Sequence, residues 1–248
     1  MSSAAQPRLV FHVLPPSHPC ATVEAALKLK GLEYEKVELR AGPHPEQMEE
    51  IYGEGHRTVP GLLIDDEPVH GSNAILERLE QLAPDPALFP DERAGAIRAA
   101  AQWGDDELQD LGRRLPWGAL HFRPESMGTL AGGDALDPAG TDFAIRYVRA
   151  AWKYHNITAV RLVEDLASLP ALLDQVDAHV SDGLLAGDVP NAADLQIGAT
   201  LSVLLTVGDV GPLIEARPAV RVARQWFPDR PGLVPAGAFP AGWVPSAG

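Results

Sequence analysis

The chain has 248 residues, of which 46% are hydrophobic and 22% charged, and its formal net charge is −14 at pH 7. These values are typical of a globular protein with one large domain or two ordinary ones. The acidic balance argues against nucleic acid or an anionic membrane as a partner, because both bind clustered lysine and arginine. No apolar run approaches the roughly 18 residues that indicate a membrane-spanning helix.

The cellular compartment is indicated by the N-terminus and by the cysteine content. Residues 1–8 lack the basic start and apolar stretch of a secretory signal. Cys20 is the single cysteine, so no intrachain disulfide can form, which fits a reducing compartment. We therefore expect a cytoplasmic protein. The eight histidines show no His-x₃-His or His/Cys clustering, and we expect no metal site.

The first third of the chain alternates strand-like and helical runs. The apolar run at residues 9–14 predicts a buried strand. Pro19 suits the first position of a helix that Gly31 would end. Residues 34–39 predict a second strand, so the three elements form a βαβ unit whose strands should be parallel.

The pattern then changes to a hairpin and a helix. Residues 40–58 contain Gly, Pro and His without a clear period, and we expect one irregular helical turn there. Residues 59–64 predict a third strand, and residues 67–70 a fourth strand that Pro68 should place at the sheet edge. Ser72 is expected to be the N-cap of the next helix.

A proline-rich stretch separates this region from a helical one. Three prolines between Ala83 and Asp91 predict an ordered but irregular linker. Apolar residues then recur at helical spacing as far as Phe227, and Asn191 with Asp194 forms a variant capping box. Trp243 is an expected anchor for the C-terminal tail. The predicted organisation is a domain over residues 1–83, a linker over 84–93, an all-helical domain over 94–227 and a Pro/Gly-rich tail over 228–248.

Four motifs in order resemble those of a known family. They are Ser17-His18-Pro19-Cys20 between the first strand and helix, Thr58-Val59-Pro60, Gly71-Ser72 at a helix start, and the capping box Asn191–Asp194. Over residues 8–227 the chain resembles the bacterial glutathione transferases with a serine or cysteine active site. The resemblance implies an α/β thioredoxin-like domain followed by an all-α domain, a cis bond before Pro60, and a homodimer.

The resemblance also implies a binding site for glutathione, and no metal or redox cofactor. A helix N-terminus stabilises a thiolate through its free N–H groups and partial positive charge. The resemblance places the sulfur of glutathione at Ser17, its cysteine backbone at Val59 beside Pro60, and its γ-glutamyl carboxylate at Ser72. It also places a pocket for a hydrophobic electrophile beside the first helix of the second domain, a helix flanked by Trp103 and Trp117.

Alternative roles for these residues stay open at this point. Ser17 could serve only as a turn or capping residue, and Cys20 could be either an inert buried thiol or a rival nucleophile. Trp103 and Trp117 could be core residues. His56 and Arg57 could reach a ligand carboxylate, or could be solvated charges of no further role.

Gly71 departs from the family pattern. Members carry Glu or Gln at this position to hold the γ-glutamyl group, so another group makes that contact here, glutathione binds weakly, or the natural thiol differs. The leading hypothesis is a glutathione transferase that conjugates the glutathione thiolate to a small hydrophobic electrophile. The alternatives are a non-catalytic binding or interaction protein of the same fold, and a thiol–disulfide or reductive enzyme that uses Cys20. No motif identifies the electrophile.

Overall fold

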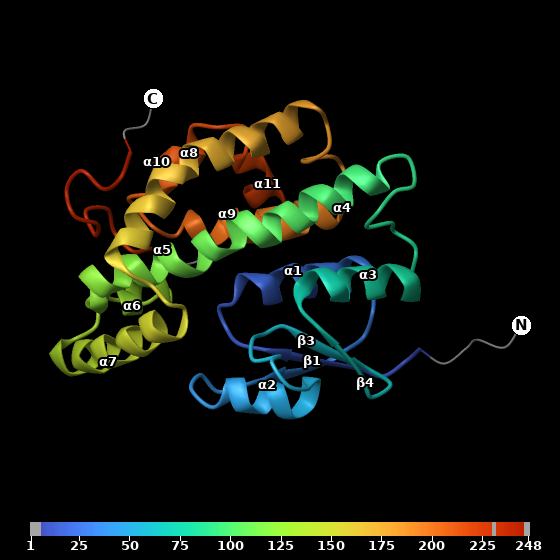
Figure 1. Cartoon of the computed structure of the whole chain (residues 1–248), viewed down its shortest axis with the longest axis horizontal. Coiled ribbons are helices and arrows are strands. Elements are labelled where there is room, and N and C mark those ends of the chain that lie inside the picture. The colour runs from blue at the N-terminus through green and yellow to red at the C-terminus, as the bar shows by residue number, and fades with distance from the viewer. Residues whose placement is uncertain (1–5, 230–231, 246–248) are drawn as a thin grey trace, which may run out of the picture. The chain divides into compact units, whose positions relative to one another are not determined.

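The computed structural model describes residues 6–229 and 232–245, and it divides into two compact units. The first comprises Met1–Gln102 and Pro190–Gln196, and the second Trp103–Val189 and Ile197–Gly248. A four-stranded sheet with helices lies in the N-terminal part, and the rest is helical (Figure 1). The predicted fold class is therefore confirmed, while the segment boundaries drawn from the sequence stay predictions.

The sheet of the first unit has the strand order β2-β1-β3-β4. Its strands are β1 (Leu9–Val13), β2 (Glu35–Glu38), β3 (Gly61–Ile64) and β4 (Glu67–His70). β2 runs parallel to β1, whereas β3 is antiparallel to both β1 and β4. The parallel βαβ unit and the edge position of the proline-containing strand β4 are both as predicted.

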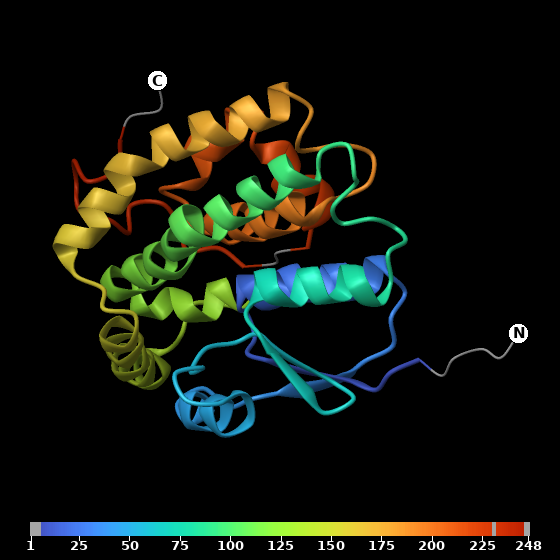
Figure 2. The ribbon, with the colours of Figure 1, turned by 45° about the vertical axis from the view of Figure 1, so that its right-hand side comes forward.

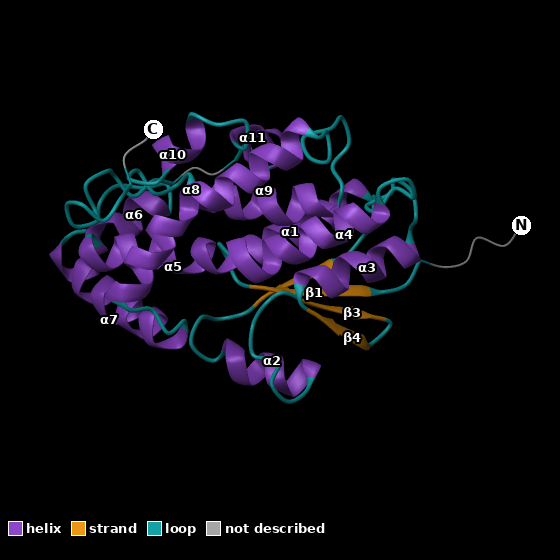
Figure 3. Ribbon diagram, turned by 45° about the horizontal axis from the view of Figure 1, so that its top comes forward, coloured by secondary structure: helices purple, strands orange, loops and turns teal. Residues whose placement is uncertain are grey.

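Helices cover both faces of this sheet (Figures 2 and 3). Helices α1 (His18–Leu29) and α3 (Ser72–Leu82) lie side by side on one face, and α2 (His44–Tyr52) covers the other. Phe11 of β1 and Ile75 of α3 are completely buried in the core. The apolar stripes on α1 and α3 thus pack against the central strands.

The region before β3 differs from the prediction in two respects. Helix α2 has nine residues rather than one irregular turn. Pro45 lies in its first turn, where a missing N–H costs nothing, and Met48 and Tyr52, four residues apart, are both buried on one side. In addition, β3 begins at Gly61 rather than at Val59, so Val59 precedes the strand.

A buried ion pair fixes the proline-rich stretch after α3. Lys30, at the C-cap of α1, has a fully buried side chain. Its Nζ donates to Glu80 Oε2 at 2.7 Å and to the carbonyl oxygens of Ala83 at 2.5 Å and Pro86 at 3.0 Å. Since the stretch forms neither helix nor strand, these bonds replace the regular ladder that would otherwise satisfy its carbonyl groups.

Glu80 also binds the proline-rich stretch directly. Its carboxylate accepts the backbone N–H groups of Leu88 at 2.9 Å and Phe89 at 3.1 Å, and the guanidinium of Arg98 lies 4.4 Å from the Phe89 ring centre. Burial raises the pKa of Glu80, but the bonds from Lys30 and the two N–H groups outweigh it, and the net pKa is lowered. Lys30 and Glu80 together hold both ends of the stretch.

The remaining helices extend from α4 through the C-terminal part of the chain. A π-helical segment separates α4 from α5 within the region where apolar residues recur at helical spacing. None of the helices in the described ranges combines the length and apolar character that a membrane span requires. The helical elements are α4 (Ala94–Trp103), η1 (Gly104–Leu108), α5 (Gln109–Phe122), η2 (Pro124–Ser126), α6 (Met127–Leu130), α7 (Pro138–Tyr154), α8 (Ala159–Ser181), α9 (Ala192–Leu204), α10 (Gly211–Glu215) and α11 (Val220–Trp226).

The predicted capping box opens α9. Asn191 Oδ1 accepts the backbone N–H groups of Ala193 at 2.9 Å and Asp194 at 3.1 Å. In return, Asp194 Oδ2 accepts the N–H of Asn191 at 3.1 Å. These reciprocal bonds satisfy N–H groups that a helix start leaves without an intrahelical partner.

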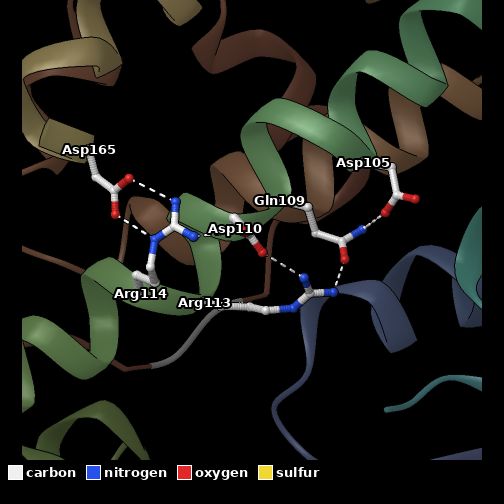
Figure 4. Close-up of polar contacts among 6 residues, drawn as sticks. All are labelled: Asp105, Gln109, Asp110, Arg113, Arg114 and Asp165. Atoms are coloured by element: carbon white, nitrogen blue, oxygen red, sulfur yellow. Dashed lines mark hydrogen bonds and ion pairs between the residues drawn. The ribbon is translucent and has the colours of Figure 1, made fainter. Parts of the chain in front are cut away.

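An ion-pair network ties α5 to α8 within the second unit (Figure 4). Arg114 Nε and Nη2 donate to the two carboxylate oxygens of Asp165 at 2.7 and 2.8 Å, and both side chains are nearly buried. Asp110 accepts from Arg113 and Arg114 at 3.0 and 2.6 Å. The bidentate pair fixes the register of the two helices, which gives this network a structural role.

The C-terminal tail packs on the second unit rather than extending away from it. Val234 forms an isolated parallel bridge with Val207, and Val234 is fully buried. Asp209 accepts backbone N–H groups of the tail at Gly237, Ala238 and Phe239. Trp243, the expected anchor, meets the ring of Phe122 edge-on at 5.6 Å.

Replacing Lys30 by methionine should lower the free energy of unfolding by about 3–5 kcal/mol, since Glu80 would keep its charge without its buried partner. Urea denaturation measures this change. Lys28→Met is the matched control, because Lys28 is exposed and pairs with Glu24 one helical turn away. The control should change stability by less than about 0.5 kcal/mol.

The same pair should appear in the pH dependence of stability. A carboxyl group whose pKa is lower in the folded than in the unfolded protein stabilises the fold above its unfolded pKa, and loses that contribution as the pH falls through the folded pKa. For Glu80 the loss begins below its ordinary pKa of 4.5. Wild-type stability should therefore fall more steeply in acid than that of Lys30→Met, and parallel curves would refute the assignment.

Candidate functional site

The start of α1 presents a serine hydroxyl at a helix N-terminus. Ser17 is the N-cap residue, and its half-buried Oγ accepts the backbone N–H of Cys20 at 3.4 Å. Helix α1 begins at His18, and Pro19 lies in its first turn, close to the predicted position. The bond from the Cys20 N–H uses a lone pair of Oγ and leaves the hydroxyl proton for donation, and the thiol of Cys20 is one acceptor within its reach.

Cys20 lies one turn further along the same helix and is buried. Burial raises the pKa of its thiol to about 11, against the opposing effect of its hydrogen bond with Ser17. A thiolate rather than a thiol is the nucleophile in disulfide exchange. The geometry therefore favours the inert alternative for Cys20 over the reactive one.

In the native protein, Cys20 should resist alkylation by iodoacetamide at about pH 8, where a thiol of this pKa is almost entirely protonated. The expected rate is at least about 100-fold below that of the same protein in urea, where the thiol is exposed and has its ordinary pKa. Mass spectrometry follows the modification over time. Equal rates in the two states, or a glutathione adduct on native Cys20 at neutral pH, would contradict the prediction.

Val59 and Pro60 lie between α2 and β3. The Val59–Pro60 peptide bond is cis, as predicted. Pro60 is buried, and its carbonyl oxygen accepts the N–H of Gly71 at 3.0 Å. Val59 is half-buried, and no hydrogen bond joins its N–H or C=O to any other described residue. Its backbone can therefore pair with an extended peptide in the manner of an added strand.

The start of α3 corrects one prediction. Gly71, and not Ser72, is the N-cap residue, and Ser72 is the first residue of the helix and is buried. Gly71 has φ +89° and ψ 145°, a conformation that is essentially restricted to glycine. The helix therefore begins at Ser72, one residue earlier than predicted, with Gly71 as its cap. The free N–H groups of the first turn remain an anion-binding feature at this helix start.

The conformation of Gly71 also affects whether this position could carry Glu or Gln, the residues that the family has there. A Cβ at Gly71 would meet nothing within 4 Å, so a longer residue would have space there. The backbone angle would strain such a residue. Glu or Gln at this position would therefore carry a conformational cost that glycine avoids.

Gly71→Gln should lower the free energy of unfolding by about 1–3 kcal/mol, because the side chain forces this φ away from its preferred region. Gly95→Gln is the matched control, since a Cβ at Gly95 also meets nothing and its φ is not positive. Within helix α4 the control should be neutral or slightly stabilising. Equal effects in urea denaturation would show that the backbone at Gly71 is not the constraint.

Trp103 and Trp117 lie on one helical run of the second unit, at the end of α4 and within α5. The Trp103 ring meets His179 at 6.2 Å, whereas the Trp117 ring meets Tyr147 at 5.6 Å. Fourteen residues of helix separate them by roughly 20 Å. One small molecule would therefore contact one of these rings and not both. Their role in a substrate pocket stays a prediction.

His56 and Arg57 have partners within the first unit. Arg57 pairs with Glu46 at 2.9 Å and Glu49 at 2.5 Å, both on α2. The His56 ring lies 4.5 Å from that of His70. These contacts give both residues a structural role beside the Thr58-Val59-Pro60 segment.

Three further residues of this region were not singled out from the sequence. His12 Nδ1 and the Tyr52 hydroxyl share a buried hydrogen bond of 2.7 Å. His70 Nε2 lies 2.7 Å from the carbonyl oxygen of Thr58. The three side chains come from β1, α2 and β4, so they come together only in the folded unit. Within the ranges described, no group of three or more His, Cys, Asp or Glu side chains is arranged to hold a metal ion.

Comparison with known proteins agrees with this fold. Residues 11–87 match the family model of the glutathione S-transferase N-terminal domain. No curated protein matches the chain. Among solved structures, the beta-etherase LigF from Sphingobium sp. strain SYK-6 is 20% identical with a TM-score of 0.65, covering 90% of this chain and 96% of LigF.

Two glutathione transferases have about the same sequence identity to this chain as LigF, with lower TM-scores. The Rhodospirillum rubrum F11 enzyme is 21% identical with a TM-score of 0.54, and the match covers 88% of this chain and 86% of that one. Rice GST1 (OsGSTU1), solved in complex with glutathione, is 20% identical with a TM-score of 0.55, covering 90% and 87%. The chain thus has the glutathione-transferase fold, and its residues 11–87 match the N-terminal domain of that family.

Proposed function

We propose that the protein is a glutathione transferase that joins the glutathione thiolate to a small hydrophobic electrophile. The observation that carries the proposal is the Val59 backbone, whose N–H and C=O have no partner among the described residues and precede a cis proline. The family match over residues 11–87, and a similar structure solved with glutathione, support the thiol peptide as the ligand.

In the proposed reaction, glutathione binds with its cysteine backbone paired to Val59 and its γ-glutamyl carboxylate at the N-terminus of α3 beside Ser72. The Ser17 hydroxyl donates to the sulfur, which loses its proton to solvent. The thiolate then attacks the electrophilic carbon, and a carbon–sulfur bond forms as a leaving group departs with its electron pair. Stabilising the anion at Ser17 raises the population of the nucleophile.

Trp103 and Trp117 are the candidate contacts for the hydrophobic electrophile. No metal or redox cofactor enters this reaction, because glutathione is a co-substrate. Because one of the similar structures is a beta-etherase, ethers belong among the electrophiles to be assayed. A homodimer and a cytoplasmic location complete the proposal.

A non-catalytic binding protein of the same fold is the second candidate, and Gly71 favours it. That residue has no side chain for the γ-glutamyl group, and its backbone conformation would strain the family's usual residue. Retention on immobilised glutathione without conjugation of an aryl halide would identify this candidate. The third possibility, an enzyme that depends on Cys20, has no support from a thiol that is buried and protonated.

Ser17→Ala should reduce kcat/KM for glutathione conjugation by about 100-fold, the loss typical of a single donor to a developing anion. The pKa of bound glutathione, read from the ultraviolet absorbance of its thiolate, should rise in the variant. Ser168→Ala is the control, since Ser168 Oγ donates to the Asp165 carbonyl within α8 of the other unit. Undiminished turnover in Ser17→Ala would remove Ser17 from the mechanism.

A further inference from the structure

Three residues on neighbouring strands lie in a row across the sheet, and the middle one, Gly61, is two residues after Val59. In the strand register, Gly61 of β3 lies opposite His12 of β1 on one side and opposite His70 of β4 on the other. A Cβ at Gly61 would overlap the ring of Tyr52. The missing side chain thus leaves space in which Tyr52, reaching in from α2, lies between the two histidines.

These contacts hold the His70 ring in one orientation. Tyr52 is bonded to His12 at 2.7 Å, and its ring centre lies 6.0 Å from that of His70. On the other side, the ring centres of His56 and His70 are 4.5 Å apart. A side chain packed on both sides by rings has little rotational freedom, so His70 Nε2 has a fixed direction.

That direction is towards the Thr58 carbonyl oxygen, at 2.7 Å. Burial lowers the pKa of His70, and the ring is therefore neutral at neutral pH. A neutral imidazole carries one N–H, and a carbonyl oxygen can only accept. The ring proton must therefore lie on Nε2, with Nδ1 unprotonated.

The Thr58 carbonyl belongs to the same peptide plane as the Val59 N–H. The Thr58–Val59 bond is trans, so its C=O and N–H point in opposite directions. A bond from His70 to the oxygen fixes the plane and turns the Val59 N–H away from the sheet row. Donation to the carbonyl also polarises the peptide and makes its N–H a better donor.

We propose that His70 is a positioning residue for thiol-peptide binding, which fixes the Thr58–Val59 plane so that the Val59 N–H meets the ligand backbone. The inference rests on the proposed function, because it assigns a support to the same binding segment. His70 does not touch the sulfur or the electrophile. Its loss should therefore weaken binding of the peptide and leave the chemical step almost unchanged.

The test compares two variants by calorimetric titration with glutathione. His70→Leu removes the donor, and its Kd for glutathione should rise about tenfold. His70→Gln keeps an N–H at the place of Nε2, and its Kd should stay within about threefold of wild type. At saturating glutathione, kcat should change less than about twofold in both variants, while KM follows Kd. His121→Leu, the same replacement in the other unit, should leave Kd unchanged.

A second measurement needs neither a ligand nor a stable variant. Nitrogen-15 correlation spectra of the wild-type imidazole rings identify the tautomer of each histidine, and His70 should carry its proton on Nε2. The opposite tautomer would overturn the inference even if His70→Leu fails to fold.

The binding results separate the two proposals. Wild-type protein that does not bind glutathione would refute the proposed function, and with it the role of His70. Wild-type binding that is equally tight in His70→Leu would refute the positioning role alone. Equal losses in the Leu and Gln variants would also refute it, because the hydrogen bond would then not be what matters.

Discussion

The Thr58–Val59 peptide plane is the feature on which the proposed site depends. β3 begins only at Gly61, so Val59 lies outside the ladder and its two backbone groups stay unpaired. Because Val59 is only partly buried, water can satisfy these groups in the free protein, and an extended peptide can replace that water. His70 fixes the orientation of this peptide plane through its hydrogen bond to the Thr58 carbonyl oxygen. A fixed plane binds an extended peptide with less loss of conformational entropy than a mobile one.

Features that depend on neighbouring residues in the chain could be predicted from the sequence. The parallel βαβ unit follows from run lengths, and the edge position of β4 from Pro68, which cannot donate to a ladder. The capping box at Asn191 follows from the spacing of two polar residues before an apolar run. The cis bond before Pro60 was expected from the family resemblance, because local chemistry alone leaves X–Pro bonds mostly trans.

Features that depend on contacts between distant residues could not be predicted. The row that contains Gly61 arises only when three strands pair in register, since His12 is far in sequence from both Gly61 and His70. Lys30 continues the buried face of α1 that Ala26 and Leu27 form, but only the fold brings it to Glu80. Ser72 suits a helix cap by composition, yet the helix already includes it and Gly71 takes the cap position. Each difference reflects tertiary constraint acting over local preference.

A crystal structure of the protein grown with glutathione tests the central claim most directly. The proposal predicts glutathione extended along Val59, with a carbonyl oxygen of the ligand about 2.9 Å from the Val59 nitrogen. It also predicts the sulfur within hydrogen-bond distance of Ser17 Oγ, and the His70 bond to Thr58 unchanged. Glutathione bound elsewhere, or a Val59 N–H that stays unpaired at saturating ligand, would contradict the account.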